Sequence, residues 1–178
     1  AGATLALLVF LGYQLIYRPI RARNLYVAGY EDIQREEYTE ANRNFDSAYD
    51  TWVMERWFFR YADAFAEKRQ YALAAEKYDQ LIFGMSEPAR EVMIEMLNRR
   101  AYDDILDIRE IHREGVLAYA EMESEVVANY DKADRLLSLL LSRNLYDYDA
   151  LLAKGDNAME WAQEDPAKYE DARVAYAS

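Results

Sequence analysis

The feature that most constrains the fold is a short pattern that occurs three times along the chain. Tyr is followed by Ala three positions later, and by Phe or Tyr four positions after the Ala. The copies are Tyr38, Ala41 and Phe45; Tyr71, Ala74 and Tyr78; and Tyr169, Ala172 and Tyr176, with a looser fourth copy at Tyr130, Ala133 and Leu137. Three copies exceed what the composition would produce by chance, so the chain is built from repeats.

A second pattern lies upstream of each copy and pairs an apolar anchor with a small residue. Its members are Leu25 with Ala28 and Gly29, Phe58 with Ala62, Leu117 with Ala120, and Leu151 with Gly155. The anchor and the small residue fall on successive turns of one helix. A small residue there lets a partner helix approach closely, and the aromatic side chain of the second helix fills the space above it.

Together the two patterns resemble the tetratricopeptide repeat, a helical hairpin of 34 residues. The repeats start near Ala22, Glu55, Glu114 and Tyr148, and the last two starts are 34 residues apart. No repeat has Trp at its first anchor, and repeat four carries about five extra residues near Pro166. The resemblance implies an all-α fold, an α-solenoid of such hairpins.

The repeats divide the chain into segments. Residues 18–84 hold repeats one and two, residues 114–178 hold repeats three and four, and residues 85–113 do not fit the signature. In that inserted segment Ser86 can cap a helix that Pro88 helps to start, followed by an apolar stripe at helical spacing. The insert is either one long helix or a broken pair. Because the chain ends within a helix of repeat four, we expect further repeats beyond Ser178.

The first 17 residues form an uncharged run, AGATLALLVFLGYQLIY, and Arg18, Arg21 and Arg23 follow it. This outline is typical of a membrane segment with a basic flank, so residues 1–17 are predicted to be a transmembrane helix. A buried core helix or a signal-peptide core is the alternative. The prediction places the protein in the inner membrane as a single-pass protein, with a periplasmic repeat domain whose orientation stays open.

Composition bears on several classes of function. A net charge of −12 spread along the chain would repel nucleic acid, so no DNA or RNA partner is expected. There is no Cys and one His, His112, and no glycine-rich phosphate loop occurs. Carboxylate clusters lack the spacing of a calcium loop. We therefore predict no cofactor, no metal site and no enzymatic activity.

The resemblance also implies a binding surface, since the first helices of successive hairpins line a concave groove in this family. The residues carried over are Arg23, Tyr26, Tyr30 and Gln34 from repeat one, Arg56, Phe59, Asp63 and Glu67 from repeat two, and Asp149, Leu152, Asp156 and Glu160 from repeat four. Tyr, Phe and Arg often dominate interfaces, so the first eight are the predicted partner-binding residues. The alternative is that the aromatic side chains pack between adjacent repeats.

These features predict a membrane-anchored scaffold that binds other proteins of a bacterial envelope complex. The pattern is similar to large tetratricopeptide proteins of bacterial envelope machines, including the periplasmic collar of spirochaetal flagellar motors. A peptide-binding chaperone or targeting receptor is the alternative, and an enzyme with its active site beyond Ser178 is a third. Homo-oligomers are compatible with all three.

Overall fold

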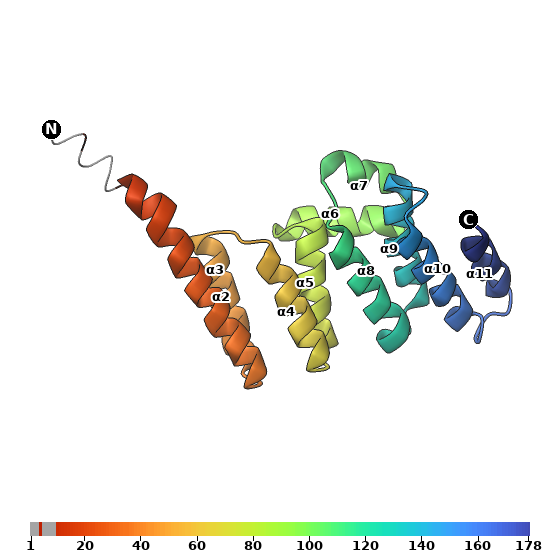
Figure 1. Cartoon of the computed structure of the whole chain (residues 1–178), viewed down its shortest axis with the longest axis horizontal. Coiled ribbons are helices and arrows are strands. Elements are labelled where there is room, and N and C mark those ends of the chain that lie inside the picture. The colour runs from red at the N-terminus through yellow and green to blue at the C-terminus, as the bar shows by residue number, and fades with distance from the viewer. Residues whose placement is uncertain (1–3, 5–9) are drawn as a thin grey trace. The chain divides into compact units, whose positions relative to one another are not determined.

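The computed structural model describes residue 4 and residues 10–178, and residues 1–3 and 5–9 lie outside that description. The described residues form ten α-helices and two π-helices, with no strand among them (Figure 1). The predicted all-α class is therefore confirmed. The bounds are η1 Tyr13–Tyr17, α2 Arg18–Gln34, α3 Tyr38–Thr51, α4 Arg56–Glu67, α5 Tyr71–Phe83, α6 Glu87–Asn98, α7 Tyr102–Ile108, α8 Arg113–Glu121, η2 Met122–Val127, α9 Tyr130–Arg143, α10 Tyr148–Trp161 and α11 Lys168–Ala177.

The chain divides into two compact units, residues 1–74 and residues 75–178, and α5 spans the boundary. In the first unit α2 packs along α3 and also contacts α4. Gly29 on α2 makes this packing close, because a Cβ there would lie 2.9 Å from the backbone oxygen of Ala41 and 2.1 Å from the hydroxyl oxygen of Tyr61. A small residue at this position thus allows the close approach that the sequence pattern predicted.

Three turns between helices have the same backbone conformation. Glu36, Arg69 and Arg100 have φ angles of 65°, 60° and 60°, in the left-handed region that non-glycine residues rarely occupy. Each follows the end of a helix, namely α2, α4 and α6, and in each turn the next amide donates to a carbonyl five residues back. This is the geometry by which many helices end, here built without glycine.

In the second unit the insert predicted as one helix or two forms the pair α6 and α7. Ser86 occupies the N-cap position of α6 and Pro88 lies in its first turn, although the Ser86 side chain makes no capping hydrogen bond. Helix α8 packs on α9, α9 on α10 and α10 on α11. The buried core between them includes the aliphatic side chains Val116, Leu136 and Leu139, which have no exposed surface.

The transmembrane prediction is wrong for the described part of the chain. Among residue 4 and residues 10–178, no helix is both long enough and apolar enough to cross a bilayer. The reason is that the helix continues without a break from η1 into α2, where Arg18, Arg21 and Arg23 end the apolar run. Residues 1–3 and 5–9 of the predicted segment lie outside the described residues. The single-pass inner-membrane localisation is corrected accordingly.

Candidate interaction groove

Two helices of the second unit, α8 and α10, begin at side-chain caps. Helix α8 starts after His112, whose Nδ1 accepts a hydrogen bond of 3.0 Å from the amide of Gly115. Helix α10 starts after Asp147, whose carboxylate accepts from the amide of Ala150 at 3.2 Å. Such caps satisfy amide groups that the first turn of a helix leaves without partners.

The same two helix starts are joined by an ion pair. Arg113 donates to both carboxylate oxygens of Asp147, each at 2.7 Å, and to Asp149 at 2.6 Å. The hydrogen bonds from Arg113 hold the pKa of Asp147 below its usual value. Arg113 and Asp147 are 34 positions apart in the sequence, and the pair joins the start of α8 to the start of α10.

A groove of about 750 Å³ lies along these helices. Its lining comes from α8, from η2, from α9 and above all from α10. The lining residues are Leu117, Ala120, Glu121, Ser124, Glu125, Tyr130, Leu137, Asp149, Leu152, Ala153, Asp156, Asn157, Met159 and Glu160. We call this the α8–α10 groove. The size lies within the range of pockets that bind ligands or side chains of a partner.

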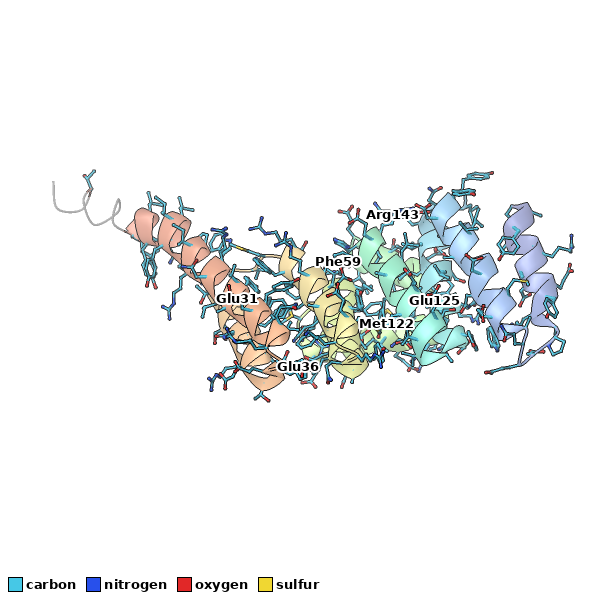
Figure 2. All side chains as sticks on the ribbon, turned by 60° about the horizontal axis from the view of Figure 1, so that its bottom comes forward. Glu31, Glu36, Phe59, Met122, Glu125 and Arg143 are labelled. Carbon is cyan, nitrogen blue, oxygen red and sulfur yellow. The ribbon has the colours of Figure 1, made fainter. Side chains whose placement is uncertain are left out.

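All of the ionisable side chains with a full charge that line the groove are acidic. Glu121 and Glu125 come from the α8–η2 side, and Asp149, Asp156 and Glu160 come from α10. Figure 2 labels Glu125 on η2. Glu121 and Glu125 are exposed and form no ion pair with any residue in the described part of the chain. The groove therefore presents concentrated negative charge to a ligand.

The cationic side chains of α8 and α10, Arg113 and Lys154, already form ion pairs within the fold. Lys154 on α10 forms an ion pair of 2.5 Å with Asp134 and donates to Ser138 at 2.6 Å, which ties α10 to α9. Arg113 is held by Asp147 and Asp149. Because Lys154 and Arg113 pair with other carboxylates of the fold, they do not neutralise Glu121 or Glu125.

The apolar part of the groove is accessible. On α10, Leu152 and Met159 are each 41% exposed, and Tyr148, one helical turn before Leu152, is 73% exposed. Isolated exposed apolar side chains are ordinary, but three on one stripe of a helix that also lines a groove form a patch able to contact a partner. Met is also a side chain that adapts to different partners.

A buried polar cluster fixes the opposite wall. Lys132 of α9 pairs with Glu123 of η2 at 2.9 Å and donates to the hydroxyl of Tyr119 on α8. Its Nζ also lies 4.4 Å from the centre of the Tyr119 ring. Burial raises the pKa of Tyr119 far above its usual value and raises that of Asp79 on α5 as well. These contacts join η2 to α8 and α9, and Glu125 lies on η2 two positions after Glu123.

The eight residues predicted to bind a partner lie in the first unit, and the structure gives them different surroundings. Arg23, Gln34, Arg56 and Glu67 are exposed, whereas Tyr30, Phe59 and Asp63 are half-buried. Tyr26 has no exposed surface. Its ring stacks on Trp57 with the ring centres 5.6 Å apart and meets the edge of Phe45 at 5.5 Å.

This burial makes Tyr26 a packing residue between α2, α3 and α4. The hydroxyl of Tyr61 on α4 donates to the backbone oxygen of Tyr26 at 2.7 Å, and Tyr30 contacts both Trp57 and Tyr61. Burial raises the pKa of Tyr26 to about 12. The alternative given above, that aromatic side chains pack between repeats, describes Tyr26 as the structure has it.

The α8–α10 groove contains all four residues that the repeat pattern assigned to the surface of repeat four: Asp149, Leu152, Asp156 and Glu160. Glu121 and Glu125 were missed, although Leu117, Glu121 and Glu125 follow one another at four-residue spacing.

No group of three or more His, Cys, Asp or Glu side chains in the described residues could hold a metal ion.

Comparison with known proteins adds no relative: no family model matches the sequence, and no match was found to a curated protein or to a solved structure.

Proposed function

We propose that this protein is a tetratricopeptide-like scaffold that binds segments of other proteins, and that the α8–α10 groove is its binding surface. The observation that carries the proposal is the combination of uncompensated carboxylates with an accessible apolar stripe in one groove. Grooves with both features commonly bind an amphipathic helix or an extended peptide of a partner protein.

The chemistry of the groove selects the partner segment. Glu121 and Glu125 favour Lys or Arg, and Leu152 with Met159 favours apolar side chains on the same segment. The expected ligand is therefore a basic amphipathic stretch of a protein. Electrostatic attraction of this type accelerates association and weakens as salt screens the charges.

The repeat assignment is part of the proposal and is supported by packing at its small residues. Gly155 on α10 lies against α11, where a Cβ would come within 2.3 Å of the Tyr176 ring. Ala133 and Ala172, the central alanines of two copies, are at most 1% exposed. An aromatic ring above a small residue is the arrangement that the pattern of tetratricopeptide hairpins implies.

The test is direct binding of an amphipathic Leu–Lys peptide about 18 residues long, labelled for fluorescence polarisation. The double variant Glu121→Lys, Glu125→Lys should weaken binding by about 2 kcal/mol, roughly thirtyfold in Kd. The matched control is Glu91→Lys with Asp107→Lys, an equal charge change at exposed positions that do not line the groove. Equal losses in both variants would refute a role for the groove.

A transient peptide receptor or chaperone is the second candidate, and the exposed Met159 favours it because Met surfaces repack around different partners. A scaffold and a receptor differ in how fast they release a bound partner. A scaffold should release its partner slowly and co-purify in a fixed ratio, whereas a receptor should bind several basic peptides with Kd values of about 1 μM and fast dissociation.

A further inference from the structure

The helix that begins the described chain carries an uncovered apolar surface. No residue of η1 is buried, and Phe10, Leu15 and Ile16 are 57%, 64% and 62% exposed. Ile20, one turn further along on α2, is 55% exposed. A contiguous exposed apolar surface in a folded protein marks a site of contact with another molecule.

Positive charge directly adjoins this apolar surface. Arg18, Arg21 and Arg23 follow within six positions, and the first 30 residues contain no acidic side chain, the longest such stretch in a chain whose net charge is −12. Arg21 and Arg23 are exposed and form no ion pair with any described residue. Arg18 donates to Gln14 and to the backbone oxygen of Asp50, so its charge also lacks a carboxylate partner.

Residues 10–23, which we call the N-terminal helix end, therefore have the chemistry that the α8–α10 groove selects. They offer large apolar side chains together with three guanidinium groups in one helical segment. The groove offers apolar side chains beside Glu121 and Glu125. The two surfaces carry opposite charges, and each has exposed apolar side chains that the other can cover.

We propose that the N-terminal helix end of one copy of this chain docks into the α8–α10 groove of a second copy. The inference rests on the proposed function of the groove and names its occupant. The contact joins two different surfaces, so it is head-to-tail, and a pair of copies keeps one free helix end and one free groove. Such a contact produces open chains of copies, or a ring if the rotation between copies closes.

The test uses full-length chains and two variants that each remove one surface. The groove variant carries Glu121→Lys and Glu125→Lys. The helix-end variant carries Arg21→Glu and Arg23→Glu and leaves the contacts of Arg18 in place. The control variant is Glu91→Lys with Asp107→Lys, and circular dichroism of all variants checks folding.

Sedimentation velocity is measured over a concentration series. The parent and the control variant should associate beyond a dimer as concentration rises, whereas the groove variant and the helix-end variant should each stay monomeric. An equal mixture of these two should form a dimer and nothing larger, because the groove variant keeps an intact helix end and the helix-end variant keeps an intact groove. Added salt should weaken the dimer.

A parent that stays monomeric, or a mixture that fails to associate, overturns the inference. Association of the helix-end variant alone overturns it as well, because another surface would then join the copies.

A second measurement separates this inference from the function proposed for the groove. A labelled peptide of residues 10–23 is titrated with the helix-end variant, in which the groove is free, and with the groove variant. Binding should be about tenfold weaker or more in the groove variant. If the Leu–Lys peptide binds to the groove and the peptide of residues 10–23 does not, the groove keeps its proposed function and the self-association fails. If neither binds, both proposals fail.

Discussion

The guanidinium group of Arg113 at the start of α8 donates two hydrogen bonds, both 2.7 Å long, to the carboxylate of Asp147 at the start of α10. Asp147 at the same time caps its own helix by accepting from the amide of Ala150. One carboxylate thus caps the start of α10 and joins α10 to α8, and the interaction depends on its negative charge.

Replacing Arg113 by Met should lower the free energy of unfolding by about 1 kcal/mol at pH 7, a value reduced because Arg113 is 42% exposed and partly screened by solvent. Arg113 depresses the pKa of Asp147, so the stabilisation is present above the unfolded pKa, near 3.9, and is lost as the pH falls through the folded value. Urea unfolding at about pH 7 and about pH 3 measures the difference.

The gap between the parent and Arg113→Met should narrow at acid pH. A gap that is the same at about pH 3 as at about pH 7 would show that the Arg113 side chain stabilises by packing alone. Arg99→Met serves as the control, because its ion pair with Glu95 is exposed on both sides and should contribute less than about 0.5 kcal/mol.

Gly29→Ala should destabilise the first unit by roughly 1–3 kcal/mol. The added Cβ would collide with the hydroxyl of Tyr61. It would also come too close to the backbone oxygen of Ala41, which cannot move aside as a side chain can. The thermal unfolding temperature measures the effect. Gly12→Ala is the control, since nothing lies within 4 Å of the position, and there Ala should be neutral or slightly stabilising through helix propensity. Similar losses at both positions would argue against close packing at Gly29.

Arg69→Gly should raise the free energy of unfolding by about 0.5–1 kcal/mol. Arg69 has a φ angle of 60°, which is unfavourable for a side chain and costs glycine nothing, although glycine gives back part of the gain through the entropy of the unfolded chain. Chemical unfolding measures the gain. Gly at the preceding position, Lys68→Gly, should be destabilising because Lys68 has φ −84°. Destabilisation by Arg69→Gly would mean that contacts of the Arg69 side chain stabilise the fold by more than its left-handed φ angle costs.

Tyr61→Phe should cost about 1 kcal/mol, because it removes the hydroxyl that donates to the backbone oxygen of Tyr26 while keeping the ring. Tyr148→Phe, at a position 73% exposed, should be neutral by comparison. Differential scanning calorimetry of the two variants gives the comparison. Loss of stability in Tyr148→Phe alone would contradict the burial and bonding that distinguish the two hydroxyls.

The helical class and the role of small residues could be predicted from the sequence because both depend on local spacing. Gly29 and Gly155 were identified as positions of close approach from their distance to an apolar anchor, and both have neighbours closer than a Cβ allows. The start of α10 at Tyr148 was likewise predicted from the repeat period.

The surroundings of Tyr26 could not be predicted in the same way. A residue on a first helix points either into a groove or toward the next first helix, and the periodicity of the helix is identical in both cases. The outcome depends on Trp57, which is 31 positions away along the chain and stacks on Tyr26 in the fold. Local spacing carries no information about that contact.

The wall of the groove at Glu121 and Glu125 was missed for a different reason. Surface residues were carried over for repeats one, two and four but not for repeat three, which was predicted to start near Glu114. For Glu125, the change to π-helical form at Met122 also departs from a period of 3.6 residues. The membrane prediction failed because an apolar run was read by its composition, whereas in the described residues it continues into a charged helix.

The π-helical segment Met122–Val127 also makes this wall tolerant of a single deletion. A π turn holds one more residue than an α turn, so deleting a single residue within η2 would allow the chain to continue as an ordinary α-helix. The turn would lose only the extra residue that it now accommodates, and the side chains on either side of the deletion would keep their places around the helix axis. The same deletion inside α10, whose turns hold no extra residue, would turn every later side chain by about 100°.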